Sequence, residues 1–201
     1  RELIKVVPDN PPRTKARVPN PRPYFDKEEW QLLQKVSNER IKKSRGARIR
    51  NDRNQLHDFM LFMVHCGTRV EETLRIKFRD CKVYKKNNSA KNDDRELRFT
   101  IQGKTGVRPV RGMVGAVSAF ERLKERHTPV GKKQPNPDDY LFPQNSRDSL
   151  NTLLKETGLK TDKYGRLRNA KSFRSTYIMF RLIDKIPIKS IAVNCGTSSD
   201  V

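Results

Sequence analysis

Residues 66–80 read Cys-Gly-Thr-Arg-Val-Glu-Glu-Thr-Leu-Arg-Ile-Lys-Phe-Arg-Asp, and our interpretation of the whole chain begins with this stretch. Gly67 ends a strongly apolar segment, and Arg69 follows at the predicted first turn of a new helix, three positions before Glu72. An arginine held in this way favours a phosphate partner, because its planar fork matches two phosphate oxygens and a helix N-terminus attracts anions. The stretch therefore predicts a phosphate site at Arg69.

The composition limits the partners of the chain. Of its 201 residues, 44 are Lys or Arg and 23 are Asp or Glu, so the formal net charge is +21. A charge of this size attracts polyanions, of which nucleic acid is the first candidate and an anionic membrane surface the second. No apolar run is long enough to span a membrane, and the N-terminus has no apolar signal-peptide core. We expect a soluble, intracellular protein with one sizeable core.

Other kinds of chemistry find little support in the sequence. The chain has three cysteines, Cys66, Cys81 and Cys195. They lie far apart and lack a second Cys or His at metal-ligand spacing, which favours buried thiols over a metal site. The Gly-Lys-Thr triplet at 103–105 resembles the end of a P-loop, but Arg98 stands where that motif needs its first glycine. The acid pairs at 93–94 and 138–139 are typical of solvated loops, so we expect no metal and no cofactor.

The residue pattern divides the chain into a tether and one domain. Residues 1–22 are basic and rich in proline, which indicates an extended linker from another domain upstream. In residues 23–201, apolar spacing predicts helices at 26–41, 52–66, 69–77, 115–126, 146–157, 170–185 and 187–194. Alternation predicts strands at 78–84, 96–102 and 107–111. The expected fold is α+β and mainly helical, with a small three-stranded antiparallel sheet.

Four cations occupy positions from which they can converge. They are Arg69 at a helix start, Lys104 at the tip of the predicted hairpin, and Lys171 and Arg174 on a late helix. Residues three apart on a helix share a face, so the last two point to the same side. A chain with 44 basic residues offers many such sets by chance. Spacing alone therefore leaves open whether the four form a site.

The same residues resemble those of the tyrosine recombinases, also called phage-type integrases. Residues 66–80 are similar to the first box of that family, and four positions fall in register, namely Arg69, Glu72, Ile76 and Asp80. The Gly-Lys turn at 103–104 is similar to the family's hairpin. Residues 171–177 look like the second box, and residues 195–199 look like the Gly-His-Ser-Ser turn that follows it. These elements occur in family order, which is more specific than any single box.

The resemblance implies the catalytic domain of a site-specific enzyme that cuts and rejoins double-stranded DNA through a covalent 3′-phosphotyrosine, without metal or nucleotide. Arg69 and Arg174 would grip the scissile phosphate and stabilise its pentavalent transition state, and Lys104 would protonate the leaving 5′ oxygen. Glu72 would support the arginines from behind. The resemblance also implies a homo-oligomer, a tetramer on DNA, and a cytoplasmic, nucleoid-associated protein of bacterial or phage origin.

Three positions depart from the family pattern. Lys171 and Thr197 stand where histidine is common, and Ser175 replaces another histidine. Lys171 and the Thr197 hydroxyl can still donate to a phosphate, but a lysine is a poorer base at neutral pH. The nucleophilic tyrosine of the family would fall past Val201, so we expect it outside this chain.

These departures keep two alternatives open. One is a non-catalytic DNA-binding protein that retained the fold and lost the chemistry. The other is a type IB topoisomerase, which uses a similar set of arginine and lysine residues but relaxes supercoiled DNA without a partner site.

Overall fold

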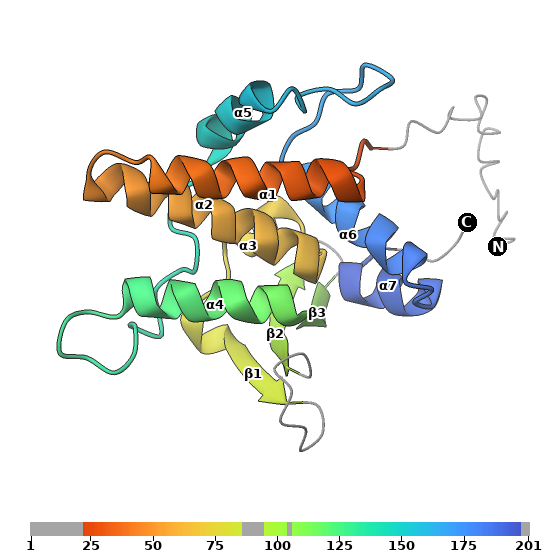
Figure 1. The fold of residues 1–201 in the computed structure, drawn as a ribbon. Helices are drawn as coiled ribbons and strands as arrows, with labels where there is room; N and C mark the ends of the chain where they lie inside the picture. The colour runs from red at the N-terminus through yellow and green to blue at the C-terminus, as the bar shows by residue number, and fades with distance from the viewer. Residues whose placement is uncertain (1–21, 86–94, 104–105, 198–201) are drawn as a thin grey trace, which may run out of the picture.

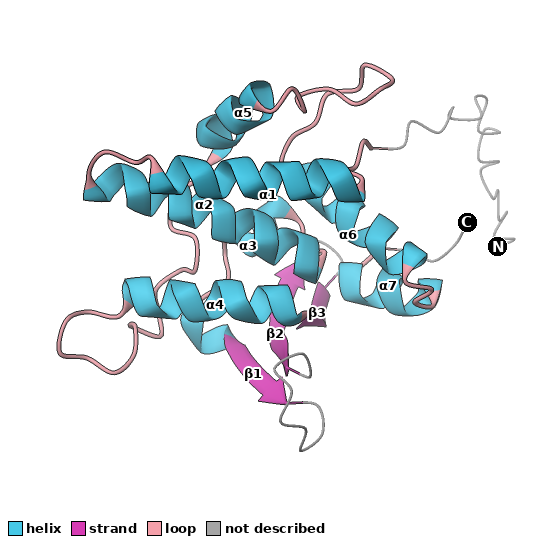
Figure 2. Cartoon of the chain, viewed as in Figure 1, coloured by secondary structure: helices cyan, strands magenta, loops and turns pink. Residues whose placement is uncertain are grey.

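A computed structural model describes residues 22–85, 95–103 and 106–197, and there the chain packs helices over a small sheet (Figure 1). The helices are α1 (Lys27–Lys42), α2 (Ala47–Cys66), α3 (Val70–Thr73), α4 (Val114–His127), α5 (Arg147–Glu156), α6 (Lys171–Ile183) and α7 (Ile188–Cys195). A short 3-10 helix, η1 (Phe78–Asp80), leads into the strands β1 (Cys81–Lys85), β2 (Arg95–Gly103) and β3 (Gly106–Gly112). The sheet is antiparallel in the order β1-β2-β3 (Figure 2), so the predicted fold class is confirmed.

Helix α2 lies at the centre of the domain and contacts α1, α4, α5, α6 and β3. Its apolar side chains fill the core, and Met60, Phe62 and Met63 are fully buried, as the apolar run predicts. The helix begins at Ala47, five residues before the predicted start at Asp52. The basic residues before that start are thus part of the helix and point outward, so the prediction placed the boundary too late.

The sheet follows the predicted alternation. Leu97, Phe99 and Ile101 on β2 are buried, whereas the residues between them are exposed. Helix α4 contacts β2 and helps to cover the buried face. Gly103 pairs with Gly106 at the end of the β2–β3 hairpin, so the predicted hairpin is present. Lys104 itself lies outside the described residues.

The predicted helix at 69–77 is wrong in its length. Only Val70–Thr73 is helical, and the chain then leaves the helix. The backbone carbonyl of Ile76 accepts a hydrogen bond from Leu141, and Lys77 bridges to Tyr140, so tertiary pairing wins over local helix propensity. Within the ranges given above, the helices lack the length and apolar character needed to cross a membrane.

Candidate active site

Three of the four predicted cations line one pocket. Arg69 at the start of α3, Lys171 at the start of α6 and Arg174 one turn later border a cavity of about 190 Å³. Its other lining residues are Arg22, Met63, Thr68, Val70 and Glu71. The elements that carry the three cations are far apart in sequence, and the fold places the three side chains around one pocket. Residue spacing alone could not predict this.

Gly67 shapes the pocket at the end of α2. Its φ of 68° is left-handed, which favours glycine, and a Cβ there would lie 2.4 Å from Cδ1 of Tyr177. This close turn directs the Gly67 carbonyl toward α6, where it accepts a hydrogen bond from Nη1 of Arg174 at 2.9 Å. Burial lowers the pKa of Arg174, and the neighbouring positive charges lower it further, yet a guanidinium keeps its proton at neutral pH.

Glu72 holds Arg69 in place through two hydrogen bonds. Its carboxylate accepts the backbone N–H of Arg69 at 2.8 Å and Nη1 of the same residue at 2.6 Å. Glu72 is buried, whereas about a third of the Arg69 side chain is exposed to the pocket. The arginine is therefore fixed at its base and open at its tip.

Arg108 on β3 is a site residue that the sequence analysis missed. Its Nη1 and Nη2 donate to the two carboxylate oxygens of Glu72 at 3.0 and 2.8 Å, and both side chains are buried. Burial raises the pKa of Glu72, but hydrogen bonds from Arg108 and Arg69 outweigh it and lower the pKa to about 2. Arg108 shares the buried face of its strand with Val110. A charged residue on the apolar face of an alternating strand is the signal that could have revealed it.

The end of α7 meets the arginines from the opposite side. Three successive backbone carbonyls, at Asn194, Cys195 and Gly196, accept hydrogen bonds from three arginines. The bonds run from Arg108 Nε at 3.2 Å, from Arg174 Nη1 at 2.6 Å and from Arg69 Nη2 at 2.6 Å. The carbonyls at a helix C-terminus carry partial negative charge and so suit cations. We call these three carbonyls the carbonyl row.

The remaining predicted residues lie around this centre. Lys171 is exposed, and Thr197 is exposed directly after the carbonyl row, although the pocket lining does not include Thr197. Lys104 cannot be placed, but its neighbour Gly103 packs so closely that a Cβ there would lie 2.7 Å from Oε1 of Glu72. The hairpin thus ends beside the Arg69 and Glu72 pair.

No described tyrosine lines the pocket. The hydroxyl of Tyr177 is buried and accepts a hydrogen bond from Asn194 at 2.9 Å, and burial raises its pKa to about 12. Tyr140 and Tyr164 are exposed elsewhere. Tyr177 is therefore a packing residue.

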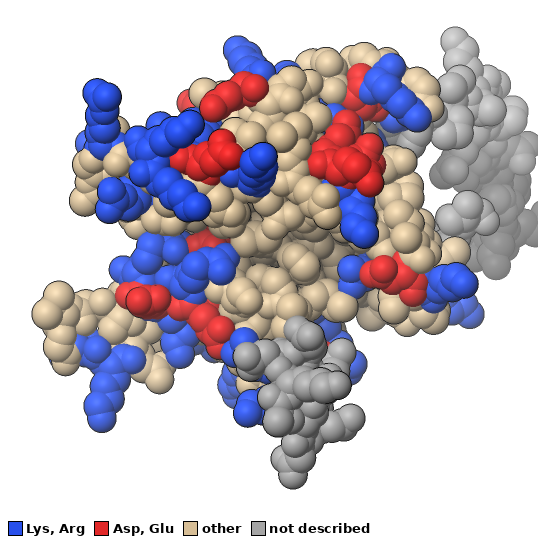
Figure 3. Space-filling view, in the orientation of Figure 1, with Lys and Arg blue, Asp and Glu red and all other residues tan. Residues whose placement is uncertain are grey.

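Positive charge also covers parts of the outer surface. On the face in Figure 3, Lys and Arg side chains crowd the edge where α1 passes into α2. Exposed residues in this region include Lys42, Lys43, Arg45, Arg48 and Arg50. The net charge of the chain is thus concentrated in patches as well as in the pocket.

Solved structures share this architecture. The XerH site-specific recombinase bound to its difH substrate aligns with a TM-score of 0.60 and 15% identity, over 90% of this chain and 49% of that chain. The chain has the fold of the tyrosine recombinase catalytic domain. A lambda integrase dimer bound to a COC′ core site aligns with a TM-score of 0.58 and 16% identity, over 94% of this chain and 49% of that one. The integrase of transposon Tn1549 aligns with a TM-score of 0.56 and 11% identity, over 90% and 60%.

The recombinase fold covers only part of those proteins. The chain spans about half the length of the XerH and lambda integrase chains. No protein-family model matches the sequence, and no curated protein matches it. Sequence identities of 11–16% to these structures support the shared fold and do not extend to activity.

Proposed function

We propose that this chain is the catalytic domain of a site-specific DNA recombinase or integrase, which breaks and rejoins duplex DNA through a covalent 3′-phosphotyrosine. The observation that carries the proposal is the shared pocket of Arg69, Lys171 and Arg174 on the recombinase fold. Two guanidinium groups converging on one pocket suit a phosphodiester, because each offers donors to two non-bridging oxygens.

The donors that remain open fit this role. A guanidinium has five N–H donors. Arg174 uses Nη1 for the carbonyls of Gly67 and Cys195, which leaves Nε and Nη2 for a ligand. Arg69 gives one bond from Nη1 to Glu72 and one from Nη2 to Gly196, which leaves Nε and one hydrogen on each Nη. Each arginine is thus anchored and still able to form a two-pronged contact with phosphate.

The other catalytic roles belong to the same proposal. Lys104, which follows Gly103 in the sequence, acts as general acid for the leaving 5′ oxygen, and Lys171 and Thr197 donate to the phosphate. A tyrosine that follows Val201 in the chain attacks the phosphorus. Residues 1–22 connect to a further DNA-binding domain, and the protein works as a homotetramer on DNA.

Binding to duplex DNA is the first test. We expect the affinity, measured by fluorescence anisotropy, to fall at least about tenfold between about 50 and 200 mM salt, since phosphate contacts release counterions. Arg174→Ala should leave binding largely intact. The slope of log affinity against log salt concentration should become shallower by about one, which corresponds to the loss of one phosphate contact. An affinity that hardly changes with salt would contradict the proposal.

Strand cleavage is the decisive test. A polypeptide that continues past Val201 to include the next tyrosine is incubated with a nicked suicide duplex, and covalent adducts are read in a denaturing gel. We expect an adduct that Arg174→Ala abolishes and that Arg147→Ala, an exposed arginine outside the pocket lining, preserves. Relaxation of arbitrary plasmid DNA would favour a type IB topoisomerase instead.

A second candidate function is supported by the substitutions at the site. Lys171, Ser175 and Thr197 replace histidines that are common in the family, which favours a DNA-binding protein without strand cleavage. Salt-dependent binding without any adduct would identify this candidate.

A further inference from the structure

Helix α7 combines a small apolar contact face with polar contacts at its C-terminal end. Only Ile191, Ala192 and Cys195 are buried in it, whereas Ile188 and Val193 are exposed. The carbonyl row at its end nevertheless contacts arginines from three other elements, β3, α6 and the start of α3. The apolar contacts that Ile191 and Cys195 make with Tyr177 are therefore joined by polar contacts in fixing the location of the row.

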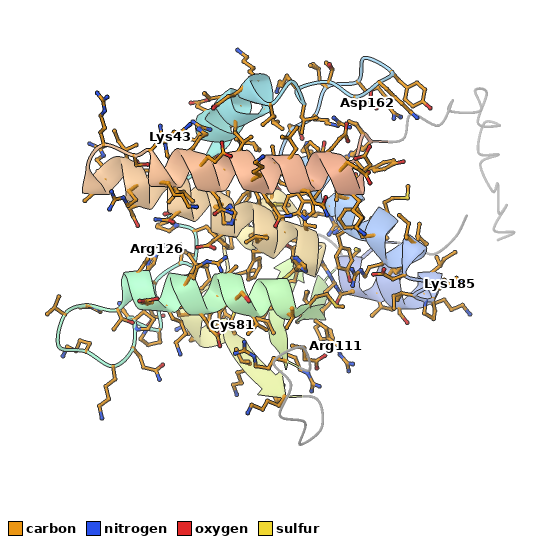
Figure 4. All side chains as sticks on the ribbon, in the orientation of Figure 1. Lys43, Cys81, Arg111, Arg126, Asp162 and Lys185 are labelled. Carbon is orange, nitrogen blue, oxygen red and sulfur yellow. The ribbon has the colours of Figure 1, made fainter. Side chains whose placement is uncertain are left out.

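Asn194 supplies those contacts. Its Oδ1 accepts the backbone N–H of Arg111 on β3 at 2.8 Å, and its Nδ2 donates to the Cys66 carbonyl and to the Tyr177 hydroxyl, each at 2.9 Å. The position of Arg111 at the edge of the sheet can be followed in Figure 4. One amide thus joins the end of α7 to β3, α2 and α6 together. Both amide hydrogens are used, so the orientation of the group is unambiguous.

The arginines depend on the row that Asn194 fixes. Arg69 and Arg174 each spend at least one N–H on the row, and those bonds determine which remaining donors face the pocket. Arg108 bonds to the row and to Glu72, and Glu72 in turn holds Arg69. A shift of α7 would therefore turn the open donors away from a common target, although no residue of the row lines the pocket.

We propose that Asn194 is a positioning residue for the phosphate pocket, because it fixes the carbonyl row that orients Arg69, Arg108 and Arg174. Phosphate affinity is then coupled to the docking of α7, and binding at the pocket stabilises α7 in return. The coupling to phosphate rests on the proposed function, whereas the orientation of the arginines by the row does not.

The test uses Asn194→Asp, which keeps the size of the side chain and the Oδ1 acceptor. It replaces the Nδ2 donor with an oxygen that faces the Cys66 carbonyl, so the link to α2 is lost. Asn145→Asp adds the same charge at an exposed position outside the pocket lining and keeps its acceptor role toward Arg147, so it is the matched control. Arg108→Lys is a second variant, which keeps the positive charge beside Glu72 and loses the two-pronged contact.

The first readout is the set of Nε–Hε signals of the arginines in ¹⁵N–¹H NMR spectra without ligand. We expect the signals of Arg69 and Arg174 to move in Asn194→Asp and in Arg108→Lys, and to stay in place in Asn145→Asp. A residue that merely stabilised the fold would lower the melting temperature and leave these signals unmoved. Unmoved signals in folded Asn194→Asp would overturn the proposal, whatever the protein binds. If that variant does not fold, Asn194→Ala, which adds no charge and removes all three side-chain contacts, decides by the same criterion.

The second readout is a titration with inorganic phosphate, followed through the same signals. We expect Asn194→Asp to bind phosphate about tenfold more weakly than the control, since one or two oriented donors are lost. Equal affinity in both would refute the coupling. Absence of phosphate binding to the unaltered chain would count against the proposed function, and the ligand-free signals would still decide the role of Asn194.

Discussion

Replacing Glu72 by glutamine tests the electrostatic centre of the structure. The carboxylate is buried between Arg69 and Arg108, and its hydrogen bonds with them lower its pKa from an ordinary value of 4.5 to about 2. Because one pKa unit corresponds to about 1.4 kcal/mol, the charged form contributes about 3 kcal/mol to folding at neutral pH. Glutamine keeps the shape and removes the charge, so Glu72→Gln should lower the free energy of unfolding by about 3 kcal/mol.

The pH dependence gives this prediction its sign. A carboxylate with a lowered pKa in the folded state stabilises fully above its unfolded pKa, and it loses that contribution as the pH falls through the folded pKa. The difference in unfolding free energy between the unaltered chain and Glu72→Gln should therefore be constant above about pH 4.5. It should shrink by about 1.4 kcal/mol per pH unit toward pH 2, where Glu72 is protonated as well.

Urea unfolding followed by circular dichroism at several pH values provides the measurement. Glu71→Gln is the matched control, because Glu71 is the adjacent residue in the same helix and is exposed. We expect that control to change stability by less than about 0.5 kcal/mol at every pH. A Glu72→Gln effect that matched the control, or one that stayed constant down to pH 2, would show that the carboxylate does not balance the arginines.

Three further substitutions probe the frame of the site. Gly67→Ala should cost at least about 2 kcal/mol of unfolding free energy in urea titrations, through left-handed strain and contact with Tyr177. Gly158→Ala, with a similar φ and open space around it, should cost only about 1 kcal/mol; equal costs would remove the contact from the argument. Asp58→Asn leaves two arginines of α4 without their buried counter-ion and should lower stability by about 3 kcal/mol, and a loss below about 1 kcal/mol would contradict this. Arg174→Lys should retain charge and weaken phosphate binding in NMR titrations, whereas full affinity would exclude a two-pronged contact.

Periodicity predicted most of the elements of the fold. The alternation of Leu97, Phe99 and Ile101 identified β2. The helix predicted at 26–41 corresponds to α1, whose N-cap Asp26 forms reciprocal bonds with Glu29. The prediction failed where tertiary contacts replaced local preference, as at Ile76, whose carbonyl pairs with a residue far along the chain. The spacing of apolar residues cannot predict such pairing, because the pairing depends on the position of a loop far away in the sequence.

The site was predictable only in part for the same reason. Arg69, Lys171 and Arg174 stand in recognisable boxes, and the pocket brings them together. Arg108 and Asn194 act through partners 36 and 86 positions away. The alternation of β3 could have pointed to Arg108 as a charged residue on a buried face, but it could not name Glu72 as its partner. Only the fold, which lays β3 and α7 side by side, gives these two residues their roles.

In the proposed function, the charge balance of the cluster suits a transition state better than a bound substrate. Arg69, Arg108 and Arg174 contribute three positive charges, and the ionised Glu72 removes one, which leaves +2 in this cluster. The other charged residues of the pocket lining, Arg22, Glu71 and Lys171, raise the total to +3. A phosphodiester carries one negative charge, whereas the pentavalent transition state of its displacement carries about two. Fixed charges that match the second state better than the first lower the barrier instead of merely tightening binding. Glu72 therefore holds Arg69 and also offsets the repulsion among the three neighbouring arginines.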